Sequence, residues 1–211
     1  FDPTLERLSR IWDPTRVARP PAPESIDLAR RGSGGWASLE TWSDGTDAWM
    51  YRAPGTALDL GGIAKGWGID CAADRLAGLG VGSALVNVGG DLAALGTAPG
   101  GRPWRVGIRD PRDPDGVVRT TDLSDGSMAT SGDYLRYFRH EGVRYAHILD
   151  PVRAAPSRGE TRSVTVAASR ATHADAAATA AFILGPAEAA DRFPKRLFRA
   201  PASRPRIIHT A

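Results

Sequence analysis

Hydrophobic residues follow two kinds of spacing along this chain, and each kind predicts a different element. Over 66–79 they recur every three or four residues and predict a helix with one apolar face, made of Ile69, Ala72, Ala73, Leu76 and Leu79. A second helix is predicted over 172–184, where Gly185-Pro186 ends the pattern. Shorter apolar or alternating runs predict strands at 36–42, 47–52, 84–88, 104–108, 128–131, 145–149 and 164–168. Strands interrupted by two helices, with several hairpin-like spacings, indicate an α+β fold.

The other segments have weaker patterns. Residues 5–11 and 188–193 each predict a short helix. The segment 14–35 is rich in Pro, Arg and Gly, so we expect an irregular connection there. Cys71 is the only cysteine, which leaves no internal disulfide and no cysteine metal cluster. Because Cys71 falls on the apolar side of the first long helix, we expect it in the core.

Charge is distributed unevenly along the 211 residues. The formal net charge is +3, yet 192–211 holds six basic residues and no acid, so the rest of the chain is net negative. The sequence therefore predicts a single domain over 1–191 followed by a basic tail over 192–211, and it argues against a nucleic-acid-binding face. No apolar run approaches the roughly 18 residues of a membrane span, so no transmembrane segment is predicted.

The segment 57–66, ALDLGGIAKG, combines a carboxylate, three glycines and a lysine at the start of the first long helix. Glycine lets main-chain N–H groups approach an anion closely, and a helix N-terminus adds unpaired donors, so a phosphate suits such a turn. Lys65 and Lys195 are the only lysines among 27 basic residues. The alternative is an ordinary strand-to-helix turn whose Lys65 points to water.

Two further motifs allow two interpretations each. The residues NVGGD (87–91) shape either a turn that meets a ligand or a plain turn. His147, in HILDP (147–151), is expected on a strand, where its near-neutral pKa would let it take a proton from an attacking hydroxyl. The alternative for His147 is a buried, hydrogen-bonded side chain.

The second long helix begins with THADAAAT (172–179). Asp175 and Thr179 are four residues apart and share one helix face, and such hard oxygen ligands suit magnesium. The competing interpretation is that Thr172 and Asp175 form a T-x-x-D capping box, and the two roles are compatible. Neither a P-loop nor a G-x-G-x-x-G fingerprint occurs, which argues against a P-loop enzyme and a Rossmann domain.

Taken in order, DLGGIAKG (59–66), NVGGD (87–91), SGDY (131–134), HILDP (147–151) and DAAAT (175–179) resemble the ApbE family of FAD:protein FMN transferases. The opening residues FDPT (1–4) also resemble a segment of that family. Each motif alone is weak, but five in family order are specific, and the match runs through about residues 1–186. That family normally has a further segment before FDPT.

The resemblance implies a T-fold-like α+β domain that binds FAD with Mg²⁺. Such enzymes cleave the FAD pyrophosphate and attach FMN through a phosphoester to a threonine of a target flavoprotein, such as a membrane redox subunit, releasing AMP. An FAD pyrophosphatase giving FMN and AMP, and a non-catalytic FAD-binding module, are the alternatives. The resemblance also implies a membrane-associated, extracytoplasmic location in bacteria, with the cytoplasm as the alternative.

The resemblance also assigns roles to residues at the matching positions. It implies that the Gly62 carbonyl, Asp175 and Thr179 bind the metal, with Thr172 as a fourth contributor. His147 and Asp175 are the implied catalytic residues. The implied FAD contacts are Phe1, Asp2, Asp59, Lys65, Asn87 and Asp133.

Overall fold

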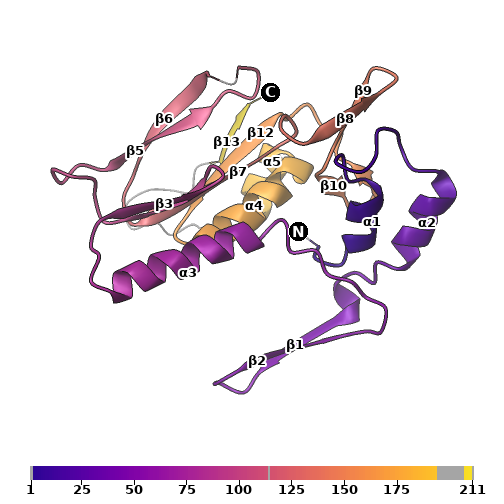
Figure 1. Ribbon diagram of the computed structural model, residues 1–211, viewed down its shortest axis with the longest axis horizontal. Helices are drawn as coiled ribbons and strands as arrows, with labels where there is room; N and C mark the ends of the chain where they lie inside the picture. The colour runs from indigo at the N-terminus through magenta and orange to yellow at the C-terminus, as the bar shows by residue number, and fades with distance from the viewer. Residues whose placement is uncertain (1, 114, 194–206, 211) are drawn as a thin grey trace. The chain divides into compact units, whose positions relative to one another are not determined.

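The computed structural model describes residues 2–113, 115–193 and 207–210, the last of these for the backbone alone. The chain divides into two compact units (Figure 1). The first unit contains Gly61–Tyr134 and the described residues of Gly159–Ala211, and the second contains Asp2–Leu60 and Leu135–Arg158. The extent of a single domain over 1–191 stays a prediction.

The first unit is built on a five-stranded antiparallel sheet with strand order β13-β12-β7-β4-β3. Its strands are β3 (Ala84–Val88), β4 (Asp91–Leu95), β7 (Gly126–Gly132), β12 (Ser163–Ala168) and β13 (Ile207–Thr210). Helices α3 (Ala64–Gly78) and α4 (Ala171–Leu184) lie together on one face, and the short helix α5 (Pro186–Arg192) follows α4. The mixed helix and antiparallel sheet architecture is confirmed.

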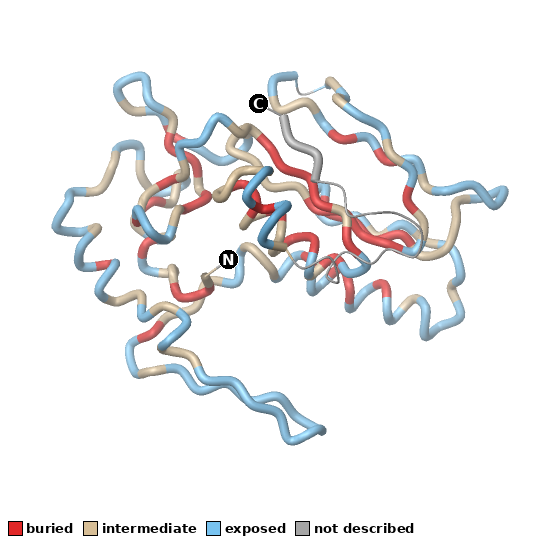
Figure 2. The backbone as a smooth tube through the Cα atoms, turned by 180° about the vertical axis from the view of Figure 1, so that it is seen from behind, coloured by how far each residue is buried: buried red, intermediate tan, exposed pale blue. Residues whose placement is uncertain are grey.

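Alternation along β4 places side chains in two separate hydrophobic clusters, one on each face of the sheet. Ala93 packs with Ile69 and Ala171 of the two helices. Leu92 and Ala94 point the other way, toward the hairpin formed by β5 (Trp104–Arg109) and β6 (Val117–Leu123). The sheet is therefore the middle of three layers, and its central strands are buried along most of their length (Figure 2).

Helix α4 packs closely because its buried face is made of alanines. The fully buried positions are Ala171, Ala174, Ala178 and Ala181. Because these alanines are three or four residues apart, they lie on one face of α4, which packs against β7 and β12. Larger side chains at these positions would hold the helix farther from the sheet.

The second unit contains two short helices and several two-stranded ribbons. The helices are α1 (Glu6–Ile11) and α2 (Pro23–Arg31), and a 3₁₀ turn, η1 (Trp36–Ser38), follows them. The ribbons pair β1 (Leu39–Ser43) with β2 (Ala48–Arg52), β8 (Tyr137–His140) with β9 (Val143–Ala146), and β10 (Leu149–Asp150) with β11 (Ala155–Pro156). Its core stacks the rings of Trp12, Phe138 and Tyr145, with centroids 5.0 to 6.5 Å apart.

Two expectations from the sequence are wrong in detail. The segment 14–35 contains helix α2, which begins with Pro23 at its first position, where a missing N–H costs nothing. Cys71 is exposed, as are Ala72 and Leu79, so the buried face of α3 is narrower than expected. Within the predicted basic tail, residues 207–210 form β13, paired with β12.

The position of His147 also differs from the expectation. Strand β9 ends at Ala146, opposite the first residue of β8 at Tyr137. His147 lies just beyond it, in a bend before β10. Its N–H donates to the carbonyl of Arg136, the residue before β8, at 3.2 Å.

Among the helices that the structure describes, none has both the length and the apolar character needed to cross a membrane.

Candidate functional site

The N-terminal turns of α3 and α4 meet at Gly66. A Cβ built on Gly66 would lie only 2.3 Å from the Ala171 carbonyl oxygen and 2.6 Å from its carbon. Glycine is therefore required at this position because any side chain would collide with the backbone of α4. This approach brings side chains near the start of α4 within reach of the backbone of α3.

Replacing Gly66 with alanine is expected to lower the free energy of unfolding by about 1–3 kcal/mol, because backbone atoms of α4 would have to move. Gly68 is the matched control, since it lies on the same helix and a Cβ there would meet nothing within 4 Å. Gly68→Ala should stabilise the chain by about 0.5–1 kcal/mol. Urea unfolding of both variants measures the difference, and equal effects of the same sign would contradict the packing argument.

Asp70 of α3 caps the start of α4. Its buried carboxylate accepts hydrogen bonds from the backbone N–H groups of Ala171 and Thr172, at 2.8 and 2.9 Å, and from the Thr172 hydroxyl at 2.5 Å. The helix thus receives its cap from another helix, and its own N-cap residue, Arg170, makes no side-chain cap. The expected capping box of Thr172 and Asp175 is therefore wrong, because the N-cap of α4 is Arg170, two residues before Thr172.

Because Asp70 caps α4, Asp175 does not serve as a cap of its own helix, and its carboxylate contacts α3 instead. Its Oδ2 accepts the Gly66 N–H at 3.0 Å, and its Oδ1 lies 3.4 Å from the Lys65 Nζ. Burial raises the pKa of Asp175, while the Gly66 N–H and the Lys65 ammonium act in the opposite direction. The interpretation of Lys65 as a side chain that simply points to water is wrong.

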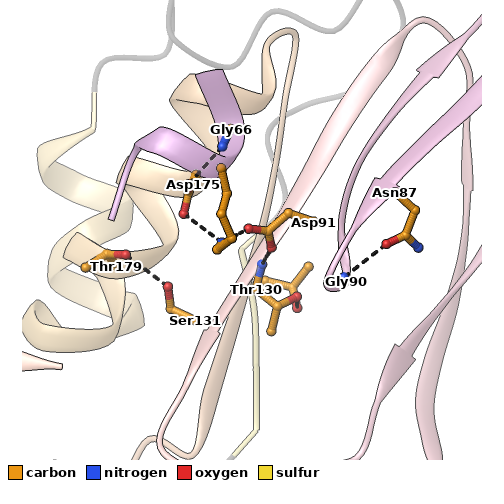
Figure 3. Close-up of polar contacts among 10 residues, drawn as sticks. Gly66, Asn87, Gly90, Asp91, Thr130, Ser131, Asp175 and Thr179 are labelled. Carbon is orange, nitrogen blue, oxygen red and sulfur yellow. Dashed lines mark hydrogen bonds and ion pairs between the residues drawn. The ribbon is translucent and has the colours of Figure 1, made fainter. Parts of the chain in front are cut away.

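Asp91 completes this constellation from the first residue of β4. Its side chain is buried, its Oδ2 forms an ion pair with Lys65, and its Oδ1 accepts the Thr130 N–H at 2.9 Å (Figure 3). Burial alone would lower the pKa of Lys65, but the hydrogen bond and charge of Asp91, with the charge of Asp175, outweigh it and raise that pKa.

The turn before Asp91 explains how the motif NVGGD positions that acid. Gly89 and Gly90 have φ values of +63° and +102°, which favour glycine, and they close the two-residue turn between β3 and β4. The Asn87 Oδ1 accepts the Gly90 N–H at 3.0 Å. Asn87 thus stabilises the turn, and its contact with FAD stays a prediction. Asp91 was missed as a site residue, although two glycines before an acid were the available signal.

Two hydroxyl groups, of Thr179 and Ser131, also lie in this region of α4 and β7. The Thr179 Oγ1 is 3.1 Å from the Ser131 Oγ of β7, one helical turn beyond Asp175 (Figure 3). Among the residues that the structure describes, no three His, Cys, Asp or Glu side chains converge to hold a metal ion. A cation beside Asp175 would therefore need hydroxyl, carbonyl or substrate oxygens, which is the kind of ligand set predicted from the sequence.

Asp133, another predicted FAD contact, is tied to the neighbouring strand. Its Oδ2 lies 3.2 Å from the Arg162 Nη1, and its N–H donates to the Arg162 carbonyl.

The second unit contains Asp2, Asp59 and His147. Gly62 lies in the turn before α3 of the first unit, and Phe1 lies outside the described residues. The Asp2 Oδ1 accepts the N–H and the hydroxyl of Thr4, at 2.9 and 2.8 Å, and the Asp59 N–H donates to the Pro3 carbonyl. The backbone bond between Asp59 and Pro3 thus joins the segment that carries Asp59 to the one that carries Asp2.

His147 has a defined tautomer. Its Nδ1 is 3.3 Å from the Arg136 carbonyl oxygen, and because a carbonyl only accepts, Nδ1 is the donor. In the neutral ring Nε2 is then the nitrogen that can take up a proton.

Comparisons with known proteins identify the family of this chain. A family model described as the ApbE family matches residues 1–197. A FAD:protein FMN transferase of Vibrio cholerae is 36% identical over 189 residues, covering 88% of this chain and 55% of that protein. Another protein of that name, from Rhodobacter capsulatus, is 45% identical over 186 residues, covering 88% of this chain and 35% of that protein.

Solved structures give the same result. The ApbE protein of Thermotoga maritima superposes with a TM-score of 0.82 at 38% identity, over 93% of this chain and 64% of that one. The flavinyl transferase ApbE of Pseudomonas stutzeri gives 0.76 at 34% identity, over 100% of this chain and 66% of that one. This chain thus spans about half the length of the Vibrio relative and less of the Rhodobacter one. With nearly its whole length matched by the family model and its fold shared with these structures, the chain belongs to the ApbE family.

Proposed function

We propose that this chain is the catalytic part of a Mg²⁺-dependent FAD:protein FMN transferase. It cleaves the FAD pyrophosphate, attaches FMN through a phosphoester to a threonine of an acceptor flavoprotein and releases AMP. One observation carries the proposal: Lys65, Asp91, Asp175 and the N–H of Gly66 converge at the start of two helices in a chain of this family. The proteins named FAD:protein FMN transferase among its relatives support the same reaction.

The proposed ligands have the donor chemistry that a magnesium ion prefers. Asp175 supplies a carboxylate oxygen, Thr179 a hydroxyl in the next turn, and Gly62 a backbone carbonyl just before α3, with Thr172 as a further contributor. All of these are hard oxygen donors, and the buried carboxylate favours a positive charge nearby. When bound, Mg²⁺ neutralises charge on the non-bridging oxygens of the pyrophosphate.

Lys65 is proposed to bind a phosphate of FAD, because its side chain is partly exposed while its carboxylate partners are buried. The N-terminus of α3 adds backbone donors and the positive end of the helix dipole. We assign the remaining contacts with FAD to Phe1, Asp2, Asp59, Asn87 and Asp133.

His147 is proposed as the general base. The threonine hydroxyl has a pKa far above neutrality, so its attack on phosphorus requires removal of its proton. The Nδ1 donor bond to Arg136 leaves Nε2 as the proton acceptor in the neutral ring. Exclusion of water from the phosphorus then decides between transfer to protein and hydrolysis of FAD.

The acceptor is proposed to be a flavoprotein with a target threonine, such as a subunit of a membrane redox complex. The corresponding location is the extracytoplasmic side of a bacterial membrane, with the cytoplasm as the alternative.

The function is tested by incubating the chain with FAD, Mg²⁺ and an acceptor flavoprotein domain, followed by mass spectrometry of the protein and of the nucleotides. We expect the acceptor to gain one FMN and free AMP to appear, both only with metal. Free FMN and AMP without labelled acceptor would indicate a pyrophosphatase. Intact FAD bound to the chain would indicate a binding module and contradict the proposal.

A further inference from the structure

We propose that Lys65 acts as an internal cation of the Asp91–Asp175 pair, and that a divalent cation at Asp175 competes with it. Asp91 is then a positioning residue that holds the Lys65 ammonium when the metal takes its place at Asp175. This inference rests on the metal site of the proposed function.

The two carboxylates are arranged in the same way around Lys65. Each gives one oxygen to a backbone N–H, of Thr130 for Asp91 and of Gly66 for Asp175, and turns its other oxygen to Lys65. The Asp91 side chain is only 3% exposed and that of Asp175 only 4%. Two buried negative charges thus share one positive charge, and buried charges of like sign need compensation.

The two contacts of Lys65 are not equivalent. Its ammonium forms the close ion pair with Asp91, whereas Asp175 lies 3.4 Å away. The Lys65 side chain is 46% exposed and has a flexible stem, so its ammonium can move without repacking the core. A divalent cation bound to Asp175 Oδ1 repels the ammonium, which then keeps Asp91 as its partner.

Competition of this kind predicts opposite effects for two substitutions. Lys65→Met removes the competing charge and should tighten divalent cation binding about tenfold, within the usual range for coupling between two sites. Asp91→Asn takes away the second anchor and leaves the ammonium with Asp175, so it should weaken binding by a similar factor. In the double variant, Lys65→Met with Asp91→Asn, the Asp91→Asn substitution should weaken divalent cation binding much less than it does alone. The reason is that the Lys65 ammonium, through which Asp91 acts, is absent.

The probe is Mn²⁺ alone, titrated into the full chain without FAD and followed by the electron paramagnetic resonance signal of the free ion. Mg²⁺ is then added to displace the Mn²⁺. Arg119→Met is the control, since it removes one positive charge from the exposed surface of β6 in the same unit. It should change the dissociation constant by less than twofold.

Thermal unfolding of Lys65 variants provides a second readout, which remains valid even when the Asp91→Asn variant does not fold. Without divalent cation, Lys65→Met and Lys65→Gln should unfold at lower temperature than the unsubstituted chain, because two buried carboxylates lose their cation. Added Mg²⁺ should restore more stability to these variants than to the unsubstituted chain.

The outcomes separate this inference from the proposed function. If Mn²⁺ binds, depends on Asp175 and is tightened by Lys65→Met, competition is supported. If Lys65→Met weakens binding or leaves it unchanged while Asp175→Asn abolishes it, the metal site stands and the competition is wrong. If Mn²⁺ does not bind or ignores Asp175→Asn, the metal site of the proposed function is itself wrong.

Discussion

Replacing Asp175 with asparagine is expected to slow FMN transfer about a thousandfold while the chain stays folded. Asparagine has the same shape, and its Oδ1 can still accept the Gly66 N–H that Asp175 binds at 3.0 Å. It lacks the negative charge that holds a divalent cation near the pyrophosphate. A bound metal contributes several kcal/mol of charge stabilisation in the transition state, and each 1.4 kcal/mol is a factor of ten in rate.

Single-turnover rates at several Mg²⁺ concentrations measure this effect. Without metal, the rates of the variant and the unsubstituted chain should converge, because Asp175 acts through the cation. Asp191→Asn is the matched control, since Asp191 is an exposed acid on α5, and it should leave the rate unchanged. An Asp175→Asn variant with full activity and only reduced stability would give this carboxylate a structural role alone.

Local patterns were sufficient to predict most elements of the fold. The helix predictions correspond to α1, α3, α4 and α5, and the strand predictions overlap β1, β2, β3, β5, β7, β9 and β12. Strands β4, β6 and β8 were not predicted. Where burial comes from tertiary contacts, local patterns were misleading. Helix α2 has one buried residue, Ala29, and the tail strand β13 depends on its partner β12. The local sequence of neither segment indicates which other part of the chain it packs against or pairs with.

The candidate site was predicted in part. Spacing singled out Lys65 and Asp175, which are 110 positions apart in the chain, and the structure brings them together at the starts of α3 and α4. The capping interpretation of Asp175 was wrong because the real cap, Asp70, comes from a different helix. A cap donated across a helix pair leaves no local motif, so sequence reasoning had no means of finding it.

Asp91 is an instructive case, because its motif was noticed and its role was not. The two glycines of NVGGD do form a plain turn, as one interpretation held. That turn nevertheless points the following acid toward Lys65 and Thr130. A turn and a charged anchor are thus compatible, and only the pairing of β4 with β7 reveals the anchor.

The second large effect is expected at His147. His147→Ala should slow FMN transfer by about 10²–10⁴-fold while FAD still binds, which is the usual contribution of a general base. Rates at saturating FAD and the dissociation constant of FAD, measured separately, test both parts. His140→Ala is the matched control, because His140 lies on β8 of the same unit, and it should leave both quantities unchanged.

His147→Asn distinguishes a base from a structural hydrogen bond. The Asn side-chain amide can reproduce the Nδ1 donor to the Arg136 carbonyl, but it has no counterpart of Nε2 that takes up a proton. If Nε2 is the base, the Asn variant should be as slow as the Ala variant, because neither side chain can take up the threonine proton. Recovery of most of the rate in His147→Asn would instead mean that the imidazole holds the bend after β9 and that another group removes the threonine proton.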